Sequence, residues 1–151
     1  MSEENKTILR RWIEEVWHEG SVDAVEEFVT DTYVRHDPNV PEVRGPEAEK
    51  QLMAMYLSAF PDLRFTIEDM VAEGDKVVVR YSIRGTHKGE LLGIPPTDKQ
   101  VTLTATETYR LVEGKIDEQW VNMDTLGMMQ QLGAIPAPGQ SEEAPPPSQP
   151  G

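Results

Sequence analysis

The sequence predicts a single α+β domain, in which helices are segregated from a mostly antiparallel and strongly curved sheet. Up to residue 60 the apolar side chains recur at helical spacing, whereas after Pro61 they alternate with polar ones, as in strands. The chain has 151 residues, which suits one domain with its own core. We expect the sheet to wrap around the first and third helices and to leave a pocket at one end.

Three helices are predicted before residue 61. Residues 3–18 carry an apolar stripe at helical spacing, and Gly20 is a typical residue at which such a helix stops. A shorter helix is expected over residues 22–29. The third opens at Gly45-Pro46, because proline is tolerated in the first turn, and it ends at Phe60.

The strands are predicted from alternation and turn residues. Gly74-Asp75 and Gly114 mark two hairpin turns, and a short helix should follow the last strand. Earlier in the chain, Tyr33–Asp37 should be extended, and Pro38–Val43 should be a loop because it carries two prolines. The main strands are expected over Leu63–Met70, Val77–Ile83, Gln100–Leu111 and Ile116–Met123.

Glu107 is an anomaly in its predicted strand, because the other side chains on that face are apolar or aromatic. A buried carboxylate is costly unless it is paired, hydrogen-bonded or protonated. The face could open onto a cavity, or Glu107 could reach water or form an ion pair within the sheet. Tyr81, Arg80 and Asn122 are the partners that the pattern suggests.

Trp120, Asn122 and Asp124 share one face of the last predicted strand. A carboxylate beside an aromatic ring and an amide at a strand end is one arrangement found in functional sites. Asp is also a favoured N-cap residue, so Asp124 could simply begin the helix that follows. Both interpretations are open at this point.

The three histidines lack the spacing of a metal site, so we expect no metal. His36 follows Tyr33 in a short extended segment, where it could be a hydrogen-bonded loop residue or a titratable site group. His18 and His87 are expected at the surface.

The composition limits the partners that we expect. A formal net charge of −13 disfavours a nucleic-acid partner, since phosphate backbones are also negative. No apolar run approaches the roughly 18 residues of a membrane span, and the N-terminus lacks the order of a signal peptide. We therefore expect a cytoplasmic protein with no membrane partner. Residues 1–135 should form the domain, and residues 136–151, which contain six prolines, a disordered tail.

Several blocks of the sequence, taken in order, resemble the SnoaL-like polyketide cyclase family of the NTF2-like superfamily. They are RRWIEEVWHEGSVDAVEEFV, GTHKGELLGIPPTDKQV, YRLVEGKIDEQW and DTLGMMQQLG. The resemblance spans nearly the whole expected domain. It implies an NTF2-like cone, with a curved antiparallel sheet enclosing a hydrophobic pocket, and it implies a homodimer.

The resemblance also implies residue roles. In the characterised cyclases an Asp of the last strand is the general acid/base of an intramolecular aldol ring closure, and Asp124 matches it, three residues before Gly127. A His in the preceding long strand accompanies that Asp, and Glu107 stands at the corresponding position here. This departure bears on the chemistry, because a carboxylate donates a proton at neutral pH only when it is protonated.

The predicted function is acid/base catalysis on a small hydrophobic carbonyl compound, with no cofactor. Asp124 would move the proton, Glu107 would share it, and Asn122, His36 and Tyr33 would donate hydrogen bonds. Two alternatives use the same fold: a hydrolase or isomerase acting on an epoxide or a ketosteroid-type ketone, and a non-catalytic module that binds a small ligand. The pocket wall would be formed by Trp12, Trp17, Tyr56, Phe60 and Trp120.

Overall fold

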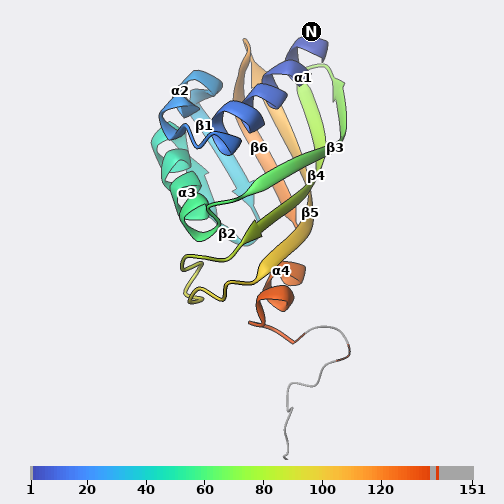
Figure 1. Ribbon diagram of the computed structural model, residues 1–151. Helices are drawn as coiled ribbons and strands as arrows, with labels where there is room; N and C mark the ends of the chain where they lie inside the picture. The colour runs from blue at the N-terminus through green and yellow to red at the C-terminus, as the bar shows by residue number, and fades with distance from the viewer. Residues whose placement is uncertain (1, 137–138, 140–151) are drawn as a thin grey trace, which may run out of the picture.

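The computed structural model describes residues 2–136 and residue 139, and it contains one six-stranded sheet (Figure 1). The strand order is β2-β1-β6-β5-β4-β3. Four of the five pairings are antiparallel, and β1 runs parallel to β6. The strands are β1 (Val29–Asp37), β2 (Val40–Arg44), β3 (Arg64–Glu73), β4 (Lys76–Thr86), β5 (Gln100–Val112) and β6 (Lys115–Met123).

The helices lie against one face and at one end of this sheet. The first is α1 (Ser2–Arg11), which continues into a π-helical segment, η1 (Trp12–His18), and crosses the sheet (Figure 1). Helix α3 (Gly45–Ala59) packs beside β1 and β2, and α4 (Thr125–Leu132) follows β6. Two short pieces, η2 (Val22–Ala24) and α2 (Val25–Phe28), lead into β1. The α+β class and the curved sheet are confirmed.

The alternation predicted for the long strands appears as alternating burial. In β5 the apolar side chains from Val101 to Leu111 are buried together with Glu107, whereas Thr102, Thr104 and Thr106 are exposed. Burying an apolar face of a sheet under helices is the main stabilising contribution to such a domain. The inner face therefore forms the core, and the outer face carries the threonines.

Both hairpin predictions are confirmed. Gly74 has a φ of 61°, and Glu113 and Gly114 have φ values of 50° and 81°. Two successive residues with positive φ are typical of the tight turns that join antiparallel strands. The turn at Gly114 sets the pairing of β5 with β6, in which Glu107 lies opposite Val121.

Three local predictions are wrong. The segment Pro38–Val43 is not a loop, because Val40–Arg44 forms β2 at the sheet edge, where Pro41 is tolerated. The second helix ends at Phe28, and Val29 already belongs to β1. The histidines expected at the surface are also enclosed: His87 is fully buried, and the His18 side chain accepts a hydrogen bond from the Phe65 amide.

Two further predictions concern the chain as a whole. The predicted tail, apart from Pro136 and Gly139, lies outside the described residues. Among residues 2–136, every helix is too short or too polar to traverse a lipid bilayer.

Candidate active site

A cavity of about 50 Å³ lies between η1, the end of α3 and the inner face of the sheet. Its lining is mainly apolar. Three aromatic residues predicted from the sequence line it, namely Trp17, Tyr56 and Phe60. Of the other two, Trp120 does not line it, and Trp12 is buried in the core and packs against Phe28, with ring centroids 5.9 Å apart.

The two ends of the cavity differ in chemistry. At the end near α4, Leu63, Arg84 and Met123 are at least partly exposed, so the cavity approaches the surface there. Met128 of α4 also lines the cavity and is buried. The buried polar lining is contributed by the strands β1, β5 and β6, through Arg35, Glu107, Tyr109 and Gln119.

Glu107 has two direct hydrogen-bond donors. The Tyr109 hydroxyl and the Gln119 side-chain amide each donate to Oε1 of Glu107 at 2.7 Å. Tyr81 lies one step further away, with its hydroxyl 2.9 Å from that of Tyr109. The other suggested partners are elsewhere: Arg80 is exposed and binds Asp69, and Asn122 is exposed.

The environment of Glu107 favours its protonated form. Only 5% of the residue is exposed. Burial raises the pKa of Glu107 above its usual value, although the guanidinium of Arg35 and the two hydrogen bonds favour the carboxylate. A carboxyl group of this kind can accept or donate a proton nearer neutral pH than a solvated one.

A second buried carboxyl group joins the same network through α3. The Tyr33 hydroxyl lies 2.7 Å from Oε1 of Gln119 and 3.1 Å from Oε1 of Glu49. Burial raises the pKa of Glu49 to about 7, against the opposing effects of Arg35 and Tyr33. Glu49 was missed in the sequence, although it lies three and seven residues before Leu52 and Tyr56, on the apolar stripe of that helix.

Arg35 and Asp37 complete the buried polar groups of this region, and both were also missed. They follow Tyr33 at alternate positions of β1, so all three side chains point inward. Nη1 of Arg35 lies 3.6 Å from Oδ2 of Asp37, and neither atom has a hydrogen-bond partner.

His36, Trp120 and Asn122 lie on the opposite, outer side of β1 and β6. There they line a groove together with Pro38 and Glu42. The His36 ring stacks on Trp120 with centroids 5.6 Å apart. These three predicted site residues are thus gathered together, but away from Glu107.

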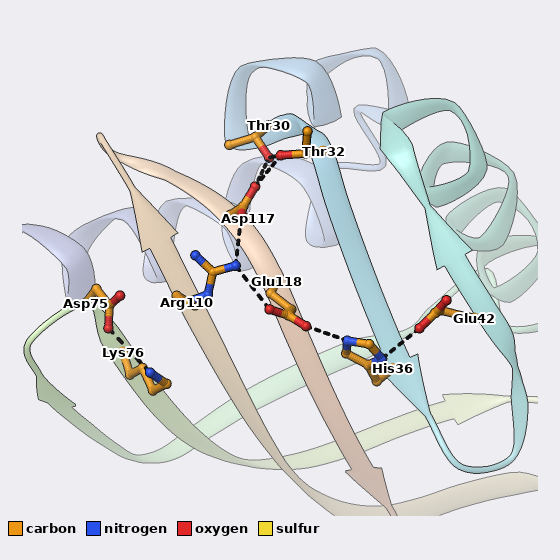
Figure 2. A network of polar contacts seen from close by, with 9 residues as sticks. All are labelled: Thr30, Thr32, His36, Glu42, Asp75, Lys76, Arg110, Asp117 and Glu118. Atoms are coloured by element: carbon orange, nitrogen blue, oxygen red, sulfur yellow. Dashed lines mark hydrogen bonds and ion pairs between the residues drawn. The ribbon is translucent and has the colours of Figure 1, made fainter.

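A polar network runs across this outer face (Figure 2). Nε2 of His36 lies 2.6 Å from Glu118, and Nδ1 lies 3.1 Å from Glu42. Arg110 donates to both Glu118 and Asp117, and Asp117 accepts from two threonines of β1. The polar contacts of His36 are therefore with two carboxyl groups on the sheet surface.

Asp124 is the N-cap of α4. Its Oδ1 accepts from the Gly127 amide at 2.9 Å, and the residue is exposed. A Cβ added at Gly127 would lie 2.2 Å from Oδ2 of Asp124, so the glycine makes room for this cap. The N-cap interpretation is confirmed, and the structure does not bring Asp124 and Glu107 to one cavity. An acid/base role for Asp124 stays a prediction.

No metal site is found within the described part of the chain. Among residues 2–136 and 139, no group of three or more His, Cys, Asp or Glu side chains is placed to hold a metal ion.

Comparison with known proteins identifies the family. The family model for the SnoaL-like polyketide cyclases matches residues 7–132, so the chain belongs to that family. It is 31% identical to the aklanonic acid methyl ester cyclase DauD of Streptomyces sp. (strain C5), over 93% of this chain and 89% of that protein. The nogalonic acid methyl ester cyclase of Streptomyces nogalater is 29% identical, over 76% of this chain and 87% of that protein.

Solved structures agree with this family and with the NTF2-like fold. A candidate SnoaL-like polyketide cyclase from Jannaschia sp. CCS1 has a TM-score of 0.82 and 27% identity, covering 89% of this chain and 95% of that one. AclR, a candidate hydroxylase from Streptomyces galilaeus, has a TM-score of 0.80 and 27% identity, covering 91% of this chain and 85% of that one. The shared fold therefore does not by itself define the reaction.

Proposed function

We propose that this protein closes a ring in a small, largely apolar carbonyl compound by an intramolecular aldol reaction. The observation that carries the proposal is Glu107, a buried carboxyl group that lines an apolar cavity and whose pKa is raised by burial. Such a group suits proton transfer to and from carbon near neutral pH.

The reaction divides into two proton transfers around one bond-forming step. Glu107 as a carboxylate removes a proton α to a carbonyl, and the C–H electron pair becomes an enolate. The enolate carbon attacks a second carbonyl carbon of the same molecule, which forms the new C–C bond and leaves an alkoxide. The alkoxide takes the proton back from Glu107, while Tyr109 and Gln119 hold the carboxyl group in place. No cofactor is consumed in this sequence.

The substrate class is supported by the lining and by the relatives. Apolar and aromatic side chains form most of the wall, which suits a hydrophobic molecule. DauD and the Streptomyces nogalater enzyme are named as cyclases of polyketide acid methyl esters, which are uncharged at the ester. A cavity of about 50 Å³ holds only a few water molecules. Any such ester therefore requires α4 or the side chains beside it to move.

The test compares two carboxyl-to-amide variants on synthetic keto esters. Glu107→Gln should lower turnover by about 10²- to 10⁴-fold, because it removes the acid/base group. Asp124→Asn should retain turnover, because Asn also caps helices. Ring closure leaves the mass unchanged, so products are separated by chromatography and identified by NMR.

Each other result of this comparison has a definite meaning. Loss of turnover in Asp124→Asn alone would move the acid/base role to Asp124, as the family resemblance implies. Full turnover in both variants would refute acid/base catalysis by Glu107 and by Asp124. Binding of the keto esters without turnover by the wild type would favour the ligand-binding module, and hydrolysed or isomerised products would favour the other enzyme classes.

A further inference from the structure

Arg35 is a buried cation that lines the cavity and has a hydrogen-bond donor without a partner. Only 5% of the residue is exposed, and it lines the cavity with Glu107 and Gln119. Arg35 lies directly opposite Gln119 in the pairing of β1 with β6, and Gln119 in turn donates to Glu107. The guanidinium thus belongs to the same polar region as the proposed acid/base group.

One nitrogen of the Arg35 guanidinium lacks a hydrogen-bond acceptor. A guanidinium has five N–H donors and no acceptor. Nη1 has no hydrogen-bond partner, and Oδ2 of Asp37, at 3.6 Å, is too distant for one. Buried donors on charged groups are costly to leave unpaired. An oxygen acceptor placed in the cavity beside Nη1 would remove that cost.

The surrounding charges indicate which acceptor fits. Asp37 is an ion-pair partner of Arg35, and Glu49 and Glu107 also act on it electrostatically. Burial alone would lower the pKa of Arg35, but Glu49 and Glu107 raise it, so the guanidinium stays charged. At the buried end of the cavity, one cation among three carboxyl groups leaves no surplus positive charge for an anionic ligand, and the second arginine of the lining, Arg84, is exposed. The acceptor that suits this site is therefore an uncharged carbonyl oxygen.

We propose that Arg35 forms a carbonyl-binding subsite, in which Nη1 donates a hydrogen bond to the ketone or ester oxygen of an uncharged ligand. This inference rests on the proposed function for its catalytic meaning. When Glu107 takes the α proton, the enolate oxygen gains negative charge, and the guanidinium stabilises it. Arg35 is then the group that polarises the carbonyl, and Asp37, whose Oδ2 lies 3.6 Å from Nη1, is its ion-pair partner.

The test uses acetophenone labelled with ¹³C at the carbonyl carbon. In the wild type the bound carbonyl signal should move downfield, as it does when a carbonyl accepts a strong hydrogen bond. Arg35→Met should abolish that shift and weaken binding by about tenfold or more. Arg80→Met is the matched control, because Arg80 is exposed on the outer face, bound to Asp69, and the shift should stay.

A second measurement needs no variant, since Arg35→Met leaves three carboxyl groups without their cation and could unfold. Wild-type protein with ¹⁵N-labelled arginine is titrated with acetophenone and, in parallel, with ethylbenzene, which has a CH₂ in place of the carbonyl. The Arg35 side-chain signals should move with the ketone only. Benzoate, the anionic counterpart, should bind more weakly than acetophenone.

The outcomes separate this inference from the proposed function. Equal responses to acetophenone and ethylbenzene, a carbonyl shift that persists in folded Arg35→Met, or tighter binding of benzoate would overturn the subsite. Failure of acetophenone to bind the wild type would also overturn it. An Arg35-dependent shift together with full turnover in Glu107→Gln would support the subsite and refute the acid/base assignment.

Discussion

Tyr33 has one hydroxyl hydrogen and two buried oxygen neighbours, Gln119 at 2.7 Å and Glu49 at 3.1 Å. If Tyr33 donates to Gln119, its contact with Glu49 is a hydrogen bond only when Glu49 is protonated and donates in turn. An ionised Glu49 would instead compete for the Tyr33 hydrogen. The protonation of Glu49 therefore determines how Gln119, and through it Glu107, is held.

This arrangement predicts that Glu49 makes its own contribution to the pH dependence of the free energy of unfolding. Its pKa rises from 4.5 to about 7 on folding, so between these values the folded state keeps a proton that the unfolded state has lost. The stabilisation is fully present below the unfolded pKa and is lost as pH rises through 7. This change in the pKa of Glu49 corresponds to roughly 3 kcal/mol in the free energy of unfolding.

Urea unfolding of wild type and Glu49→Gln at several pH values between 4 and 8 measures this effect. The other titratable groups, Glu107 among them, are common to both proteins, so their titration largely cancels in the difference. The free energy of unfolding of the wild type should fall by about 3 kcal/mol relative to that of Glu49→Gln as pH rises across that range. Parallel stability curves would show that Glu49 is not perturbed.

At the level of single elements, the start of helix α4 is stabilised by the N-cap residue Asp124. Asp124 accepts from the Gly127 amide, and the space for its carboxylate exists because Gly127 has no Cβ. Met128 of the same helix lines the cavity near its exposed end. The DTLG block that resembles the cyclase family is therefore explained locally by the start of a helix that covers the cavity.

A double-mutant cycle tests this explanation, because the effect of Gly127→Ala on stability should change sign when Asp124 is replaced. Asp124→Ala should destabilise the protein by about 1 kcal/mol through loss of the cap. Gly127→Ala should destabilise the wild type, because its Cβ would displace the capping carboxylate. In the Asp124→Ala background the same change should be stabilising, since Ala favours a helix over Gly by about 1 kcal/mol.

Thermal and urea unfolding of the four proteins give the required free energies. If Gly127→Ala has the same effect in both backgrounds, the two residues are not coupled, and the cap is not the reason for the glycine.

Across the whole molecule, the inner and outer faces of the sheet carry different chemistry. The inner face holds the core and the cavity with its buried carboxyl groups. The outer face holds exposed threonines on β5 and, beside them, the ionic network from Asp117 to Glu42 (Figure 2). The exposed threonines of β5 are uncharged, so this part of the outer face has no charge of its own to desolvate on contact with a second copy.

We expect a homodimer that uses this outer face. Light scattering should give twice the 17.0 kDa chain mass. Thr106→Arg should shift the mass towards the monomer, because it would place two like charges near the symmetry axis. Thr7→Arg, on the exposed part of α1, is the control and should leave the mass unchanged. A monomer mass for the wild type at high micromolar concentration would refute the dimer.

The sequence by itself determined the fold class, the hairpins and the place of Glu107 on the apolar face of its strand. These depend on short-range rules, namely the period of the apolar residues and the backbone preferences of Gly74 and Gly114. The SnoaL-like polyketide cyclase family also followed from sequence blocks, and the family model confirms it.

Only the tertiary structure decided which residues meet at the cavity. A bulge in β6 places both Ile116 and Gln119 on the inner face, so Trp120 and Asn122 turn outward. Alternation specifies which residues share a face until an extra residue reverses the order. Arg35 meets Gln119 through the parallel pairing of β1 with β6, and Glu49 approaches from α3. Contacts between segments so far apart in the chain depend on packing, which local patterns do not encode.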